Sequence, residues 1–267
     1  MSYQNYNGPP MPEARTSPSF ISHLQRYGRS RLFLTGIILF TIGTTLSTII
    51  SWTLLAFIPL ALAALPIIGF WLIYASSKNA EKPEKVLTAL TLFKVHTIIT
   101  LVLMCLLAML ITLLSLATYF GGAGTSADLA FSLFAALIMF SLIPLYYVSI
   151  LNIIKSIRQN IINNTFNPIR GVLPFTIITF IYVGFFVLAI VVMLVLMGIS
   201  GLLAINEPMW YYPTQDVFSG VAMMSMLMMF VVFVSVIYLS GMVGTVICVI
   251  ILNRLAKSIS NILLHND

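Results

Sequence analysis

The chain has 267 residues, of which 60% are apolar and 7% are charged, with a formal net charge of +6. A soluble domain carries about 25% charged residues, so this composition excludes a water-soluble fold and predicts a protein of the lipid bilayer. The positive charge does not indicate a nucleic-acid partner, because no basic stripe is interleaved with stacking aromatic residues.

The apolar residues form long runs instead of alternating with polar ones. In a bilayer every backbone polar group must be paired within the protein, which leaves helices or a closed barrel. Barrel strands would alternate apolar and polar residues, whereas residues 172–205 contain no charge and few polar side chains. We expect an all-α fold: a polytopic transmembrane helical bundle of six spans, arranged as three antiparallel hairpins.

The first two segments precede the membrane domain. Residues 1–19 hold four prolines and no apolar period, so a disordered cytoplasmic tail is expected. In residues 20–31, Phe20, Leu24 and Tyr27 are spaced three to four apart among three arginines, which predicts an amphipathic helix on the inner membrane surface. A plain charged flank to the first span is the alternative.

Residues 32–264 are expected to form the membrane domain. A span requires about 20 residues, and turn residues and charges divide the domain into spans at about 33–51, 55–76, 93–119, 129–154, 172–204 and 217–252. The last two apolar runs are longer than a bilayer requires, so they should tilt or project beyond it. A break is expected in the fifth span at residues 198–201, and residues 265–267 form a C-terminal tail.

Basic residues lie on one predicted side of the membrane. All 13 Lys and Arg fall in the terminal segments or near the loops after the second and fourth spans, whereas the other loops hold Asp128, Glu207 and Asp216. Because basic residues resist translocation, both termini are expected in the cytoplasm. The cytoplasmic face then has 13 basic and four acidic residues, a charge of +9. This is the layout of a multi-pass protein of a cell membrane, as in bacteria.

A weak repeat links the fourth and sixth spans. Ile150–Asn152 and Ile251–Asn253 close these spans, and Lys155–Ile157 and Lys257–Ile259 follow them. Either a helical hairpin was duplicated or both segments converged on the same way of leaving the membrane. Beyond the fourth span, four isoleucines share one helical face: Ile153, Ile154, Ile157 and Ile161.

The sequence has no motif for catalysis, a cofactor or a metal. Ionisable groups deep in a membrane mark function, yet none of the seven acids falls inside a predicted span. The three histidines are scattered at His23, His96 and His265. His96, beside Lys94, is expected to be an interfacial histidine, with a proton relay or a head-group ligand as the alternative. We therefore expect no enzyme, no cofactor and no metal site.

Small and polar residues recur at helical spacing within two spans. One stripe in the first span comprises Thr41, Thr44, Thr48 and Ser51. Overlapping small-xxx-small pairs in the sixth span comprise Ser240, Gly241, Gly244 and Thr245. Helix packing within the bundle is the favoured interpretation, with a polar pore lining or an oligomer contact as the alternative. Cys105 and Cys248 lie at different predicted depths, so no disulfide is expected.

These features predict a non-catalytic accessory or scaffold subunit. Its basic cytoplasmic face would bind anionic lipid of the inner leaflet, a protein partner or a second copy of the chain. A channel, facilitator or permease subunit for a neutral or lipidic substrate is the alternative, favoured by the kinks expected at Pro59, Pro66 and Pro144. The candidate lipid or partner contacts are Arg26, Arg29, Arg31, Lys155, Arg158, Arg254 and Lys257. The candidate outer-loop contacts are Trp210, Tyr211 and Tyr212, unless these form an aromatic belt.

Overall fold

The residues that the structure describes form seven helices. A computed structural model describes residues 19–51, 57–78, 83–122, 125–206 and 214–266, and every regular element in these ranges is helical. The helices are α1 (Phe20–Gly28), α2 (Arg31–Ser51), α3 (Phe57–Lys78), α4 (Pro83–Phe120), α5 (Ser126–Asn163), α6 (Val172–Asn206) and α7 (Thr214–Asn266). Each of the last six is long and apolar enough to cross a membrane. The protein is therefore an all-helical, multi-pass membrane protein, and the predicted all-α class with six candidate spans is confirmed.

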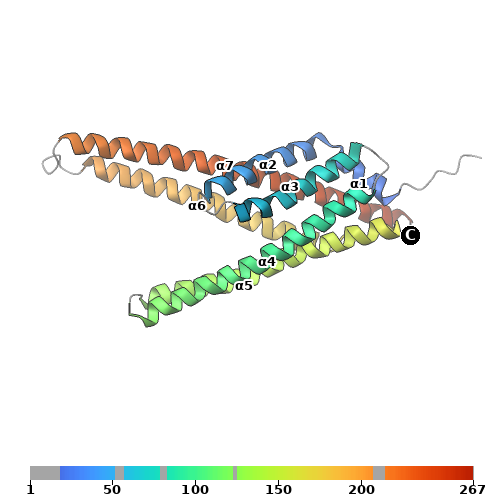
Figure 1. The fold of residues 1–267 in the computed structure, drawn as a ribbon, viewed down its shortest axis with the longest axis horizontal. Helices are drawn as coiled ribbons and strands as arrows, with labels where there is room; N and C mark the ends of the chain where they lie inside the picture. Colours follow the sequence, from blue (N-terminus) through green and yellow to red (C-terminus); the bar gives the residue numbers. More distant parts are fainter. Residues whose placement is uncertain (1–18, 52–56, 79–82, 123–124, 207–213, 267) are drawn as a thin grey trace, which may run out of the picture.

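The basic residues gather at one end of the bundle, which we call the basic end. There α1 lies beside the starts of α2 and α4 and the ends of α3, α5 and α7 (Figure 1). Ten described basic residues belong to this end: Arg26, Arg29, Arg31, Lys78, Lys85, Lys155, Arg158, Arg170, Arg254 and Lys257. Lys94 lies about three turns into α4. Glu84 is the one acid that the described part of this end contains.

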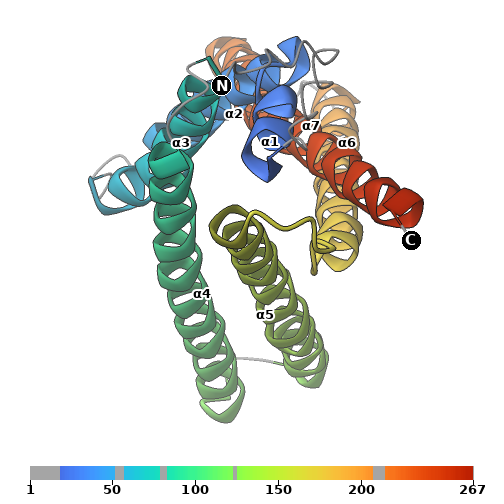
Figure 2. The same cartoon turned by 90° about the vertical axis from the view of Figure 1, so that its right-hand side faces the viewer.

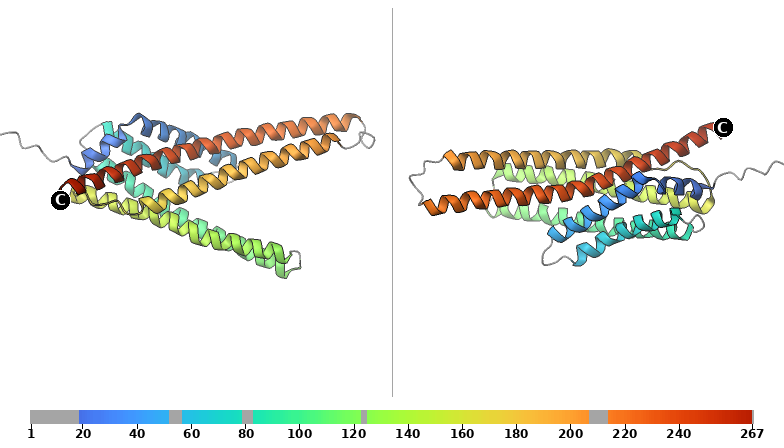
Figure 3. Two further views of the ribbon diagram at one scale, coloured as in Figure 1. Left: turned by 180° about the vertical axis from the view of Figure 1, so that it is seen from behind. Right: turned by 90° about the horizontal axis from the view of Figure 1, so that it is seen from above.

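Two long hairpins diverge from the basic end. The α4–α5 pair and the α6–α7 pair separate toward their far tips, with the shorter α2–α3 pair beside α7 (Figure 1). Looking toward the basic end, α5 lies between α4 and α6 (Figure 2), and α6 and α7 run side by side in both further views (Figure 3). Toward the far tip, α6 exposes six consecutive apolar side chains, from Val191 to Leu196, around its whole circumference. Lipid is the solvent that suits such a surface.

Hairpin neighbours are not always the closest partners. The most extensive helix contact joins α2 to α7, ahead of the contact between α2 and α3. A methyl group on Gly43 would lie 2.2 Å from the backbone nitrogen of Gly241, and one on Gly244 would lie 2.4 Å from that of Phe40. The absence of side chains at these positions lets the two backbones meet. The small-residue pairs predicted in the sixth span therefore lie at this contact within the chain.

The hydrophobic core lies at the basic end and joins five helices. Its buried members are Phe20, Val86, Leu90, Ile153, Ile154, Ile157, Ile169, Val172, Leu255 and Ile259. The apolar face predicted beyond the fourth span packs here, since Ile153, Ile154 and Ile157 are buried and Ile161 is partly buried against them. The repeat contributes one isoleucine from each copy, Ile157 and Ile259. An asparagine follows eight residues after Asn152 and after Asn253, and these two differ, because Asn160 is fully buried and Asn261 is exposed.

Several predicted boundaries change. The break expected at residues 198–201 is wrong, because α6 is continuous to Asn206. A helix break inside a membrane would leave backbone groups unpaired, whereas a glycine within a helix costs only about 1 kcal/mol. α5 and α7 continue beyond the predicted spans because their ends pack into the core, so residues 265 and 266 belong to α7. Residues 1–18 and the outer-loop contacts Trp210, Tyr211 and Tyr212 lie outside the described residues.

Candidate functional site at the basic end

α1 caps the end of α3. The last carbonyl groups of a helix have no partner within it, and those of Ser76 and Ser77 belong to fully buried residues. The Gln25 side chain donates from Nε2 to the Ser76 carbonyl oxygen at 3.1 Å, and Arg29 Nε donates to that of Ser77. Residues 20–28 are thus a helix docked on the bundle through specific polar contacts.

Aromatic packing fixes the other side of α1. The Phe20 ring meets Phe166 edge-on at 5.7 Å between centroids, and the Phe20 amide donates to Asn164 Oδ1 at 3.0 Å. The His23 ring lies 5.5 Å from Tyr27 and 6.0 Å from Phe166. Burial, and secondarily Arg26, lowers the pKa of His23 below its ordinary value of 6.5. His23 is therefore neutral at pH 7.

A buried amide organises the connection between α5 and α6. Asn160 is fully buried, and its Nδ2 donates to the carbonyl oxygen of Asn167 at 2.8 Å while its Oδ1 accepts from the Asn167 amide at 3.1 Å. Gly171 then reverses the chain with φ +90°, and a methyl group there would lie 2.6 Å from the Ser149 carbonyl oxygen. Only glycine fits both the torsion and the space. Hydrogen bonds and this reversal give the connection one conformation.

This connection forms one wall of a polar hollow of about 490 Å³. Its lining residues are Asn152, Lys155, Ser156, Gln159, Asn160, Asn167, Pro168 and Arg170. The five from α5 fall on one helical stripe, opposite the isoleucines of the core. The Arg170 amide donates to Ser156 Oγ at 3.2 Å, which ties the start of α6 to α5. Lys155 and Arg170 bring two positive charges to a lining that contains no acid.

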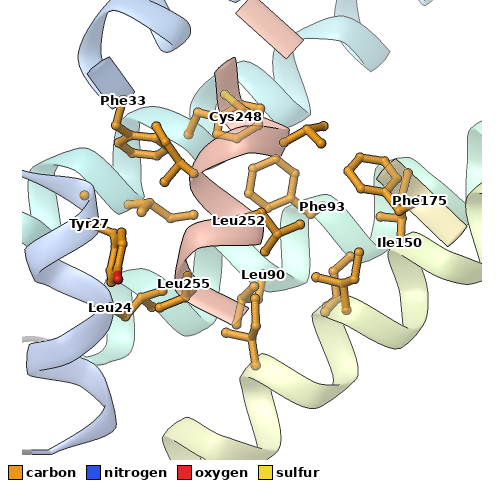
Figure 4. Close-up of a pocket in the computed structure, with 18 of the residues that line it drawn as sticks. Leu24, Tyr27, Phe33, Leu90, Phe93, Ile150, Phe175, Cys248, Leu252 and Leu255 are labelled. Carbon is orange, nitrogen blue, oxygen red and sulfur yellow. The ribbon is translucent and has the colours of Figure 1, made fainter. Parts of the chain in front are cut away.

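A second, apolar cavity of about 210 Å³ lies within the basic end. All seven helices contribute side chains, and those shown in Figure 4 point toward one another from α1, α2, α4, α5, α6 and α7. Its few polar groups come from Tyr27, Thr245 and Cys248. An apolar cavity of about 150 Å³ stays dry and accepts benzene. This cavity is large enough for a short piece of hydrocarbon, but smaller than the roughly 300 Å³ of a typical ligand pocket.

The predicted contact residues fall into two groups. The first group, Arg26, Arg29, Arg31, Arg254 and Lys257, belongs to α1, the start of α2 and the end of α7, and Tyr27 Oη of α1 donates to the Arg254 carbonyl oxygen of α7 at 3.4 Å. Lys155 and Arg158 lie on α5, and of all seven residues only Lys155 lines the polar hollow.

Of the eight lining residues only Lys155 was among the predicted contacts, and Arg170 is the second cation of the hollow. A signal was present: a short loop returns the start of one helix to the end of the previous one, so Arg170 had to come back near Lys155.

Other predicted residues have packing contacts. Thr245 Oγ1 donates to the Gly241 carbonyl oxygen at 3.0 Å, and Ser240 Oγ donates to that of Ile237 at 2.7 Å. In α2, Thr48 Oγ1 donates to the Thr44 carbonyl oxygen. No described residue of the threonine stripe lines the apolar cavity.

The histidine and cysteine predictions have separate outcomes. His96 lies on α4 with its side chain partly buried, and its Nδ1 is buried without a hydrogen-bond partner. Its position at the membrane interface stays a prediction. Cys105 and Cys248 are both free, as predicted. Among the residues that the structure describes, no three His, Cys, Asp or Glu side chains come together.

The fold and the basic end define a class: a multi-pass helical membrane protein with a packed, cationic end. No family model, curated protein or solved structure matches the chain. Its function is therefore argued from the physical character of the basic end.

Proposed function

We propose that this protein is a non-catalytic accessory or scaffold subunit of a cytoplasmic membrane, and that its basic end holds anionic lipid. One observation carries the proposal: ten described basic residues lie at one end of the bundle, with Glu84 as the single described acid there. The single negative charge of Glu84 cannot neutralise these ten positive charges. By the positive-inside rule this end faces the cytoplasm, where the leaflet is anionic.

The strength of the attraction supports lipid binding. Each cation near an anionic leaflet contributes on the order of 1 kcal/mol, and the effect falls off within about 8 Å at physiological salt. The charges at the basic end are solvent-accessible, with Arg26, Arg158, Arg170, Arg254 and Lys257 all exposed. The hydrophobic core below them holds their spacing fixed, so they act together on one patch of membrane.

The test compares lipid selection by the full chain in nanodiscs of phosphatidylcholine with 20% phosphatidylglycerol. The variant K155Q/R158Q/R254Q/K257Q should retain much less phosphatidylglycerol by native mass spectrometry. High salt should likewise reduce the phosphatidylglycerol retained by the wild type, because salt screens exposed charges. A control variant, T118A/S141A, changes exposed polar residues away from the basic end. Unchanged lipid selection in the quadruple variant would contradict the proposal.

The apolar cavity favours a second candidate, a carrier of lipidic cargo. Its hydrocarbon lining, from all seven helices, suits an alkyl chain and not a polar solute. Such a carrier would move a fluorescent phospholipid between the leaflets of proteoliposomes. A bulky Leu252→Trp substitution in the cavity should then slow that movement. A rate equal to that of protein-free liposomes would remove this candidate.

A further inference from the structure

We infer that the polar hollow between α5 and α6 binds the phosphate group of one anionic phospholipid. The inference rests on the proposed function, but it assigns lipid binding to a single site instead of to the whole cationic surface. The hollow is the place where the structure joins two cationic side chains that are 15 residues apart in sequence, Lys155 and Arg170.

The chemistry of the lining suits a phosphate. Arg presents a planar fork of donors that matches phosphate oxygens, and Lys supplies a compact point charge. Asn152 and Gln159 add amide groups on the same wall, and both are exposed. The volume of about 490 Å³ is that of a small-molecule site. A cationic, donor-rich hollow without a lining acid favours an anion over a cation or a neutral sugar.

The frame of the hollow is already ordered. Both polar atoms of the Asn160 side chain are hydrogen-bonded to the Asn167 backbone, and Ser156 Oγ accepts a hydrogen bond from the Arg170 amide. Gly171 then sets the direction in which α6 leaves. A site that is ordered before its ligand arrives loses less entropy on binding. The start of α6 adds a partial positive charge on the same side.

The neighbouring surface selects a lipid phosphate over a free one. Immediately after Arg170, α6 turns Leu173, Ile177 and Phe180 outward, with exposed fractions of 71%, 51% and 50%. Their spacing of four and three residues gives one apolar stripe along the helix. A phospholipid could place its phosphate in the hollow and lay its acyl chains along this stripe. A soluble phosphate would gain nothing from the stripe.

The experiment titrates phosphatidylglycerol into phosphatidylcholine nanodiscs that contain the full chain, with binding followed by native mass spectrometry. K155Q/R170Q should raise the Kd for the most tightly held lipid by at least about tenfold. The matched control R158Q/K257Q removes the same charge from exposed residues outside the hollow, and should raise the Kd for that lipid by a clearly smaller factor than K155Q/R170Q does.

A second variant guards against a folding defect. Gln159→Glu removes no cation and changes an exposed side chain, yet it puts a negative charge into the hollow. It should weaken phosphatidylglycerol binding by several-fold, while the unfolding temperature in pure phosphatidylcholine stays that of the wild type. Normal binding by Gln159→Glu would overturn the site, even if K155Q/R170Q proved unstable.

The outcomes separate the site from the function. Equal losses in K155Q/R170Q and R158Q/K257Q would overturn the hollow as a site and leave the general lipid-binding function standing. No loss in either variant would overturn both. Inorganic phosphate is added in a further arm: if it displaces phosphatidylglycerol, and binds with the same dependence on Lys155 and Arg170 in pure phosphatidylcholine, a soluble phosphate is the ligand and the lipid assignment fails.

Discussion

The side chain of Gln25 donates a hydrogen bond of 3.1 Å to the carbonyl oxygen of Ser76, 51 residues further along the chain. Both residues are buried, so this bond is made where neither group has water as an alternative. Together with Arg29 on Ser77, it makes α1 the cap of α3. The short helix before the first span is thus part of the basic end itself.

Breaking that cap should loosen α1. Gln25→Leu leaves the Ser76 carbonyl oxygen buried without its donor, a defect that costs about 1–3 kcal/mol. We expect a lower unfolding temperature in mild detergent and faster proteolysis at residues 28–31. Arg26→Gln changes an exposed side chain of the same helix and should leave both nearly unchanged. Equal stability of the two variants would show that the contact contributes little.

Acid should weaken the docking of α1. The folded pKa of His23 is lowered, first by burial and then by Arg26, and its buried Nε2 has no hydrogen-bond partner. Below about pH 6.5, His23 therefore binds a proton more readily in the unfolded chain than in the folded chain, so the stability of the folded state decreases as the pH decreases. The unfolding temperature should drop between pH 7.5 and 5. His23→Phe should flatten this slope, and a slope equal to the wild type would contradict the assignment.

Adding even one methyl group at the α2–α7 contact should destabilise the protein. Gly244→Ala places a carbon 2.4 Å from the Phe40 backbone nitrogen, and overpacking of this kind costs about 1–3 kcal/mol. Gly184→Ala is the matched control, since its new carbon meets nothing within 4 Å and alanine favours a helix by about 1 kcal/mol. Resistance to SDS should fall for the first variant and hold or rise for the second.

The reversal at Gly171 should be similarly intolerant. Gly171→Ala combines a positive φ with a contact of 2.6 Å to the Ser149 carbonyl oxygen. Gly122→Ala has the positive φ alone, with open space around it, so it isolates the torsional cost of about 1 kcal/mol. We expect the first variant to unfold at a clearly lower temperature and to lose bound phosphatidylglycerol. Equal unfolding temperatures of the two variants would mean that the backbone at Gly171 shifts to accommodate the methyl group at little cost.

Filling the apolar cavity should stabilise the basic end. Cys248→Leu adds carbon atoms to a cavity of about 210 Å³, and each Å³ of empty cavity costs about 24 cal/mol. The unfolding temperature should therefore rise. Cys105→Leu changes the other free cysteine, which is absent from the cavity lining, and should have no such effect. A fall in stability for Cys248→Leu, with loss of a retained lipid, would instead show that the cavity is occupied by a hydrocarbon chain.

The spans and the charged end followed from the sequence because hydrophobicity and charge act locally. A run such as residues 172–205 has to be helical in lipid whatever it packs against. The shared helical face of Ile153, Ile154 and Ile157 was also predicted from their spacing, but that this face is buried in the core is a finding of the structure. The break expected near Gly198 failed because the demand for paired backbone groups outweighs the weak helix propensity of glycine.

Which helices meet could not be read from the same patterns. The small residues Gly241 and Gly244 indicate a close contact, but nothing in their spacing names α2 as the partner instead of α6. The choice depends on the joint packing of all the helices, since apolar faces are alike in lipid and no hydrophobic force selects between them.

By itself, the order of residues determined that this chain is a helical membrane protein with its cations on one side. Only the tertiary structure decided that α1 caps α3, that side chains of seven described helices line an apolar cavity, and that Lys155 shares a hollow with Arg170. The physical reason is the distance along the chain over which each kind of interaction acts. Transfer to lipid and helix formation are settled within one segment, whereas a cap, a cavity or a pair of cations needs side chains from segments that only the folded bundle brings together.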